Sequence, residues 1–403
     1  MQSIKIEILD RKIVMELTLV EKHQIKYHSK AHKECDRLCF LSKNLYNSTL
    51  YAIRQHYFNT KKHLSYPEVN KKFAFDNQVD YRALPAKVSQ RTQKLVDQNF
   101  KSFFALLKTE NLNWKPKPPK YLDKVKWRQI VHYQEKALSK KLPWYIKLSQ
   151  TNLKIKTDKQ VCYARIVPHN WKYTIELWYK VPLREMLTPQ WKFASIDLWV
   201  NNLVTLVSNC FNPLIVNWRP LKSINQYYNK TTSELKKTSY SRKKLWNRRK
   251  NKINDYLHKA SRYLVNHLVS NGIDTLVIWY NKEWKQETKL WKVNNQNFVS
   301  IPFQRLIDML KYKCRLEGIQ VVIQEESYTS KCSFLDNETI GKHSEYLWKR
   351  IKRWLFKSSS WKLINADVNW ALNILKKHVA SIREELSFAD EVEVCSMPIK
   401  INL

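Results

Sequence analysis

The scarcity of glycine limits the folds open to this chain more than any other property of its sequence. Average usage of ~7% would give a chain of this length about 28 glycines, but only Gly272, Gly318 and Gly341 are present. Tight turns, helix C-caps and bulges need residues that tolerate a positive φ, and glycine is the usual choice. Sixteen tryptophans accompany the deficit. Several stand where a turn would favour glycine: Asn113-Trp114-Lys115, Asn170-Trp171-Lys172, Asn217-Trp218-Arg219 and Ser360-Trp361-Lys362.

Positive charge is the second constraint. The 403 residues include 72 Lys and Arg against 35 Asp and Glu, a formal net charge of +37. A chain so charged repels itself unless a polyanion is bound. Its 43% apolar and 13% aromatic residues indicate folded domains, about two to three at this length. No run of about 18 uncharged apolar residues occurs, and residues 1–14 alternate apolar with charged side chains. These features argue against the membrane and secreted classes.

The seven scattered cysteines, an odd number without an export signal, are typical of reduced cytosolic thiols. His32, Cys35 and Cys39 lie close together in an apparently helical stretch, but no fourth ligand is nearby. We therefore predict no structural zinc there.

Hydrophobic periodicity predicts a mixed α/β, multidomain chain. Residues 1–20 alternate as strands, and residues 21–110 contain amphipathic helices near 28–58 and 86–108. The basic, proline-rich segment Lys115–Lys120 begins a linker. It is followed, within residues 111–190, by short alternating runs that indicate antiparallel strands.

Residues 191–380 alternate strands with helices, which predicts an α/β domain around a mixed sheet. Apolar strands are expected at 193–207, 275–280 and 319–324, and helices at 221–270, at 302–316 and from about 367. Residues 381–403 show no convincing pattern and form a tail.

Basic residues concentrate in the helical stretch 236–262, which contains eleven Lys and Arg, a single acidic residue and interleaved aromatic side chains. A second basic set spans 349–357. This arrangement favours phosphate contact over a merely solvated helix face, without naming the type of nucleic acid. The predicted nucleic-acid-binding residues are Arg242, Lys243, Lys244, Arg248, Arg249, Lys250, Lys349, Arg350, Lys352 and Arg353.

Acids at the ends of apolar strands are conspicuous in so basic a chain. Asp197 lies within the strand pair at 193–207, Glu325 and Glu326 follow the strand at 319–324, and Asp367 fits the first turn of the last helix. A buried carboxylate is costly unless it is paired or metal-bound. Three such groups can supply the hard oxygen ligands of two Mg²⁺ ions about 4 Å apart that flank a scissile phosphate. The alternative is that Asp367 is only a helix-terminal acid and Asp197 a turn residue.

Several of these motifs resemble the RuvC-type nuclease motifs of TnpB, the OrfB-type protein of bacterial insertion sequences, which is related to type V CRISPR effectors. They are Phe193–Leu206, Ile301-Pro302-Phe303, Tyr328–Lys331 with Ser333–Asp336, and Ile364–Asn369. Leu41–Asn47 is similar to the family's amino-terminal helix. The resemblance implies a β wedge unit (1–20 and 111–190), an inserted helical recognition lobe (21–110) and a RuvC/RNase H-like nuclease domain (191–380). A basic helical insertion at 221–270 and a nucleic-acid-binding segment at 329–362 belong to that domain.

Two departures from the family pattern matter. The middle glutamate of the family falls on the strand that here is Thr275–Tyr280, which has no carboxylate. Glu326, or else Glu325, would replace it from the neighbouring strand; the alternative is that neither binds metal. The family's paired CxxC motifs are reduced to Cys332, so no zinc is expected.

The resemblance also bears on glycine, because Trp191, Trp199, Trp279, Trp291, Trp348, Trp354 and Trp370 fall where related sequences show glycine. We hypothesise that the gene uses UGA as a glycine codon and that the printed sequence translates it as tryptophan, although Trp284 resembles a genuine family tryptophan. The alternative is a truly tryptophan-rich protein.

Together with the charge and the three acids, the resemblance to TnpB implies a transposon-associated, RNA-guided, Mg²⁺-dependent DNA endonuclease of the bacterial cytoplasm and nucleoid. Its partners would be a guide RNA encoded by the transposon end and target double-stranded DNA, with no membrane. A nuclease-inactive, RNA-guided DNA-binding regulator is the first alternative. A general basic RNA-binding protein would explain the charge but not the three acids.

Overall fold

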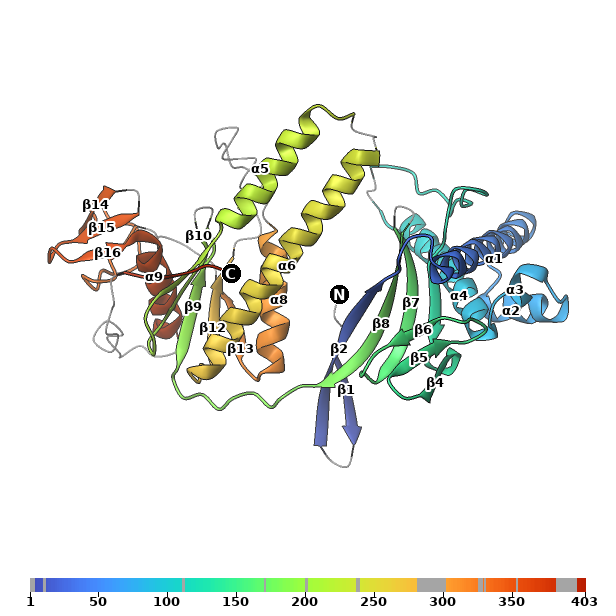
Figure 1. Cartoon of the computed structure of the whole chain (residues 1–403), viewed down its shortest axis with the longest axis horizontal. Helices are drawn as coiled ribbons and strands as arrows, with labels where there is room; N and C mark the ends of the chain where they lie inside the picture. Colours follow the sequence, from blue (N-terminus) through green and yellow to red (C-terminus); the bar gives the residue numbers. More distant parts are fainter. Residues whose placement is uncertain are drawn as a thin grey trace. The chain divides into compact units, whose positions relative to one another are not determined.

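The computed structural model describes residues 4–9, 12–110, 113–169, 172–199, 202–236, 240–280, 302–324, 329, 331–352, 354–381 and 397–403, with side chains from Met15 onward. The chain divides into two compact units, Met1–Pro182 and Leu183–Leu403, which we call the first and second units (Figure 1). Among the described helices, none has the length and apolar character needed to cross a membrane.

The first unit is built on an antiparallel five-stranded sheet with the order β1-β2-β8-β7-β3. Alternating sequences form all of these strands, as expected. A smaller sheet, β4-β5-β6, belongs to the same unit. The bounds are β1 Ile4–Leu9, β2 Lys12–Gln24, β3 Val131–Gln134, β4 Leu138–Leu142, β5 Tyr145–Leu148, β6 Lys154–Lys156, β7 Val161–His169 and β8 Lys172–Pro182.

The helices of the first unit are α1 Lys30–Thr60, α2 Tyr66–Phe75, α3 Val79–Arg82 and α4 Ala86–Leu107. Apolar side chains at helical spacing on α1 and α4, such as Leu45 and Phe100, pack into one core with the sheet. The proline-rich segment lies along α1: Asn47 exchanges two hydrogen bonds of 2.9 Å with the backbone of Leu122, and Arg54 donates to the Pro119 carbonyl.

The cysteines near the start of α1 belong to this core. Cys35 and Cys39 are fully buried. Burial raises the pKa of the Cys35 thiol to about 12 and that of Cys39 well above its usual value. Both groups therefore favour the thiol over the thiolate that binds metal.

The second unit contains the mixed sheet that the sequence predicts, in the order β13-β12-β9-β10-β11-β17. Strands β9, β10 and β11 form an antiparallel meander, whereas β12 runs parallel to β9 and β13 parallel to β12. The bounds are β9 Phe193–Asp197, β10 Asn202–Ser208, β11 Leu214–Asn217, β12 Thr275–Trp279, β13 Gln320–Gln324 and β17 Ile399–Ile401.

Helices cover both faces of this sheet (Figure 1). They are α5 Arg219–Ser233, α6 Tyr240–Ser270, α8 Phe303–Leu316 and α9 Ala366–Ala380. Ala194 and Ile196 of β9 share a core with α6 and α8, while Phe193 shares a second core with α9. Because side chains alternate along a strand, the odd-numbered residues of β9 face α9.

Two features of the second unit are absent from the sequence predictions. Residues 348–365 form a three-stranded antiparallel sheet, β14 Trp348–Lys352, β15 Leu355–Ser358 and β16 Leu363–Asn365. The tail is not patternless throughout, since β17 pairs in parallel with β11 at the edge of the large sheet. A three-residue strand is too short for alternation to be recognised in the sequence.

Among the tryptophans that the structure describes, three adopt the left-handed backbone conformation: Trp144 (φ 63°), Trp191 (φ 60°) and Trp361 (φ 65°). A positive φ is a genuine outlier for a bulky residue, and Gly272 and Gly318 adopt it too. In contrast, Trp218, another candidate turn residue, has an ordinary φ of −99° and is buried in the core. The structure therefore supports the glycine hypothesis at specific turns and not at every tryptophan.

The turns at Trp144 and Trp361 are of types that favour glycine. Trp144 follows Pro143 in the two-residue loop between Leu142 and Tyr145, which pair as the ends of β4 and β5. Proline followed by a residue of positive φ is the preference of a type II turn. Between β15 and β16 the Ser358 N–H donates to the Lys362 carbonyl at 2.9 Å, which closes a three-residue loop of residues 359–361. Trp361 is the last of these, at the left-handed position that completes such a hairpin.

We predict that Trp144→Gly and Trp361→Gly each raise the free energy of unfolding by about 1 kcal/mol, because the left-handed conformation costs a non-glycine residue roughly 1–2 kcal/mol. Little burial is lost, since these side chains are 67% and 76% exposed. Trp127→Gly is the control: this exposed tryptophan has no positive φ, and glycine there should lower stability by about 0.5 kcal/mol. Denaturant titration measures all three.

The glycine hypothesis also has a direct chemical test. Peptide mass spectrometry of the protein from its native cells should give the residue mass of glycine at positions 144 and 361. Tryptophan masses at these positions would refute the hypothesis, whatever the effect of the substitutions on stability.

Candidate nuclease site

Asp197 is the last residue of β9 and is only 3% exposed. Two residues earlier, the Ser195 hydroxyl donates a 2.6 Å hydrogen bond to the Ala371 carbonyl of α9. Asp197 shares this face of the strand by alternation. A carboxylate is thus held on the α9 side of the sheet, at the end of a fully buried strand.

Asp367 lies in the first turn of α9, as the sequence predicts. Asn365 caps the helix, and its side-chain oxygen accepts from the backbone N–H of Asp367 at 3.0 Å. The Asn202 amide, at the start of β10, donates a 2.6 Å hydrogen bond to Asp367 Oδ2. This bond fixes the carboxylate against the β9–β10 end of the sheet.

Two contacts between the β9 segment and α9 show how the helix runs along the strand. Ser195 meets Ala371, and farther along the chain the Trp199 ring meets the Trp370 ring edge-on, with centroids 5.5 Å apart and planes at 86°. From Ser195 to Trp199, the partner on α9 thus changes from Ala371 to Trp370, that is, toward the amino end of the helix, where Asp367 lies. Asp197 ends β9, and Asp367 accepts from Asn202 at the start of β10, so both predicted acids lie at the β9–β10 end of the sheet.

The middle acid is not located in this way, because Glu325 and Glu326 lie outside the described residues. The preceding strand, β13, ends at Gln324 opposite Trp279 of β12, and β12 carries no carboxylate. Since β9, β12 and β13 are parallel, their carboxyl ends meet at one edge. The described end of β13, Gln324, is two strands from β9, about 10 Å across.

The donor set suits a hard divalent cation. Asp197 and Asp367 provide carboxylate oxygens, which Mg²⁺ prefers, and Asn202 orients the second of them. Sequence reasoning missed Asn202, although its place after an apolar strand beside a candidate acid was a usable indication. Within the described residues, no three His, Cys, Asp or Glu side chains gather as a metal-binding group.

The predicted basic residues of α6 divide into two classes. Arg242 donates to the carbonyls of Thr232 and Leu235, and Arg249 donates to Asn225 Oδ1 at 2.7 Å, so these two stabilise the packing of α5 on α6. Burial lowers the pKa of Arg249. Among the described residues, the other predicted side chains of α6 do not make such contacts with α5. Lys243, Lys244 and Arg248 are exposed, and the Lys250 ammonium lies 5.2 Å from the Trp246 ring centroid.

The second basic set lies on β14, where Lys349, Arg350 and Lys352 are all exposed. The Arg350 guanidinium lies 4.9 Å from the centroid of Phe356, and the Trp348 ring stacks on Phe356 with centroids 3.7 Å apart. Arg353 lies outside the described residues. The set therefore combines cations with aromatic rings on one small sheet.

In the segment that contains Cys332, two carboxylates accept hydrogen bonds that join separate parts of the chain. Glu338 accepts from the backbone N–H groups of Ser333 (2.6 Å) and Leu347 (3.2 Å), and Asp336 accepts from the hydroxyl of Ser359 (2.6 Å). Burial opposes ionisation of Asp336, but hydrogen bonds from Ser333 and Ser359 lower its pKa. The charged form therefore stabilises this segment.

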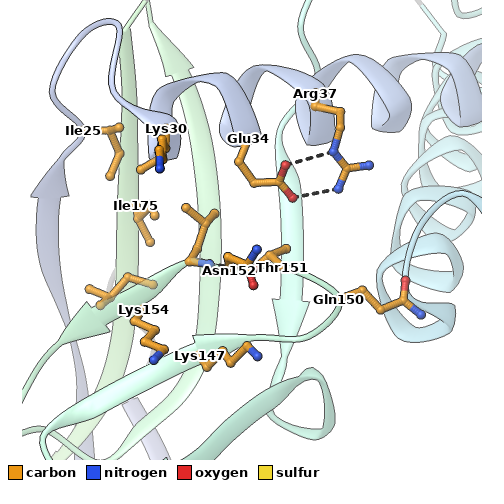
Figure 2. A pocket seen from close by; sticks show the side chains of 13 residues that line it. Ile25, Lys30, Glu34, Arg37, Lys147, Gln150, Thr151, Asn152, Lys154 and Ile175 are labelled. Atoms are coloured by element: carbon orange, nitrogen blue, oxygen red, sulfur yellow. Dashed lines mark hydrogen bonds and ion pairs between the residues drawn. The ribbon is translucent and has the colours of Figure 1, made fainter.

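A basic cavity of about 850 Å³ in the first unit was also missed by the sequence analysis. Figure 2 shows it between α1 and the β5–β6 hairpin, with Glu34 and Arg37 paired to each other at its rim. Lys30, Lys147 and Lys154 line it as well. Their separation in the sequence gives no cluster to recognise.

Comparisons with known proteins fit these observations. Residues 176–285 match the family OrfB_IS605, described as a probable transposase, and residues 303–374 match the family described as Cas12f1-like, TNB domain. No curated protein matches the chain.

Solved structures align with most of the chain. The cryo-EM structure of the Cas12f1–sgRNA–target DNA complex aligns with a TM-score of 0.50 and 12% identity, over 86% of this chain and 82% of that one. The mini RNA-guided endonuclease CRISPR-Cas_phi3 aligns with a TM-score of 0.44 and 9% identity, over 89% and 92%. The predicted mixed α/β fold is confirmed, and the two family matches confirm the resemblance of this chain to the OrfB-type proteins of insertion sequences.

Proposed function

We propose that this protein is an RNA-guided DNA endonuclease that hydrolyses phosphodiesters with Asp197, Asp367 and either Glu326 or Glu325. The observation that supports the proposal is that Asp197 ends β9 and Asp367 is hydrogen-bonded by Asn202 at the start of β10, in a unit with matches to OrfB_IS605 and the Cas12f1-like TNB domain. The structure of Cas12f1 with sgRNA and target DNA supports the same choice of partners, guide RNA and target DNA.

The acids would hold two Mg²⁺ ions. When bound, such ions activate water for attack on phosphorus and stabilise the leaving oxygen. The residues of the chain provide the positioning: β9 holds Asp197 in a buried place, and Asn202 keeps the Asp367 carboxylate in one orientation. The exposed lysines and arginines of α6 and β14 would bind the nucleic acid through its phosphates, while base pairing provides sequence specificity.

A nuclease-inactive, RNA-guided DNA-binding regulator is the second candidate. Two observations favour it: β12 has no carboxylate, and the rings of Trp199 and Trp370 contact each other close to both acids in the chain. The tests below therefore use the printed sequence and also a variant with glycine at positions 199 and 370.

The first test removes one carboxylate at a time. Asp197→Ala and Asp367→Ala should each slow Mg²⁺-dependent cleavage of guide-matched DNA by about 1,000-fold or more, because metal-held charge stabilisation is worth several kcal/mol. Guide-dependent DNA binding should persist. Asp308→Ala is the matched control, an exposed acid on α8 of the same unit, and should cut normally. Binding without cleavage by the glycine variant with its acids intact would favour the regulator.

The second test identifies the middle acid. Glutamine keeps the shape of glutamate but lacks the charge that a hard cation requires, so Glu326→Gln and Glu325→Gln should differ in cleavage rate. The larger loss marks the ligand, and we expect it at Glu326. Full activity in both variants would show that neither glutamate binds metal.

The third test concerns phosphate contact by α6. The affinity for guide RNA is measured at several salt concentrations. Replacing Lys243 and Lys244 with alanine should reduce the slope of log affinity against log salt concentration by about 1.4–1.8, because each phosphate contact contributes about 0.7–0.9. Lys259→Ala is the control, since this lysine on the same helix is paired with Asp255 at 2.9 Å. An unchanged slope in the double variant would place this face of α6 in solvent.

A further inference from the structure

A second cavity, of about 250 Å³, lies between α5 and α6. Its α5 wall carries residues spaced as on one helix face, and so does its α6 wall. The lining residues are Ser223, Ile224, Tyr227, Tyr228, Leu245, Arg248, Arg249 and Lys252. At this volume, below the ~300–1,000 Å³ of sites for drug-sized ligands, the cavity admits one flat ring system.

One wall of the cavity is fixed by contacts within the protein. The Arg249 guanidinium lies 5.3 Å from the Tyr228 ring centroid and is held by the Asn225 amide. The Arg249 guanidinium thus already lies over the Tyr228 ring. Arg249 and Tyr228 form a wall of the cavity, so a bound ligand would contact the other lining residues.

The other groups are available. Tyr227 is 59% exposed, and within the described residues its ring has no aromatic or cationic partner. Arg248 and Lys252 are exposed one turn apart on α6. An open aromatic face beside two cations is the combination that binds unpaired nucleotides, since the base stacks on the ring and the cations hold the phosphates.

We propose that this cavity binds one unpaired nucleotide of an RNA strand, with the base stacked on Tyr227 and the flanking phosphates on Arg248 and Lys252. Ser223, which lines the same cavity, favours RNA over DNA because a serine hydroxyl can hydrogen-bond a ribose 2′-OH. The proposal rests on the proposed function in that a guide RNA would supply the nucleotide, and it adds a structural requirement to that RNA.

The cavity can be separated from the general charge of α6. Phosphate contacts alone bind paired and unpaired RNA alike, whereas stacking on Tyr227 requires a base that is free of its partner. A bulged nucleotide should therefore raise affinity for the intact protein, and this gain should depend on the aromatic ring at position 227.

The experiment compares an RNA hairpin that carries one bulged adenosine with the same hairpin lacking the bulge. Binding is measured by fluorescence anisotropy with the full chain freed of RNA, in Asp367→Ala background and without Mg²⁺. We expect the bulge to tighten binding about 10-fold, Tyr227→Ala to abolish that gain, and Tyr227→Phe to retain it. Tyr240→Ala is the matched control, an exposed tyrosine on α6 outside the cavity.

Three outcomes would overturn the proposal: no preference of the intact protein for the bulge, an equal loss on both hairpins in Tyr227→Ala, or loss of the gain in Tyr240→Ala. A deoxyadenosine bulge that binds as well as adenosine would refute the choice of RNA. Unchanged circular dichroism of Tyr227→Ala excludes misfolding. Because no cleavage is measured, failure here leaves the nuclease proposal intact, and failure of the cleavage tests leaves this result intact.

Discussion

The packing of α9 across β9 is the interaction on which the candidate site depends. The Ser195 hydroxyl is buried and bonds the Ala371 carbonyl, so a slip of the helix along the strand would leave a buried polar group unsatisfied, at a cost of about 1–3 kcal/mol. This register brings the start of α9 to the end of β9. Two acids 170 positions apart in the chain, Asp197 and Asp367, thus lie at the same end of the sheet because of a contact that neither of them makes.

The excess of positive charge shapes both units in a consistent way. The scarce buried acids are used inside the protein: Asp97 lies between His63 and Lys101, and Glu176 between Lys22 and Arg165. Exposed cations on α6, on β14 and around the cavity of Figure 2 far outnumber the acids near them. Internal pairing therefore leaves the surface charge largely uncompensated, and bound nucleic acid would relieve the repulsion.

Sequence periodicity predicted the elements of this fold better than it predicted their partners. Alternation and helical spacing indicated β9, β12, α6 and α9 because each buries a continuous face. They missed β14–β16, whose strands are only three to five residues long, and β17, which gains its structure from pairing with β11. The acids of the site were recognisable as carboxylates at strand and helix ends, but Asn202 and the α5–α6 cavity arise only when separate segments pack together.

The glycine hypothesis and the choice between enzyme and regulator are connected at the candidate site. Trp144 and Trp361 show independently of any resemblance that tryptophan stands at turns suited to glycine. Trp199 and Trp370 have ordinary backbone conformations, so strain gives no evidence there, and only their rings bear on function. If UGA encodes glycine at the strained turns, the same codon rule would apply to these two positions. The indole pair beside the acids would then be absent, and one of the two observations that favour a regulator would disappear, leaving only the missing carboxylate of β12.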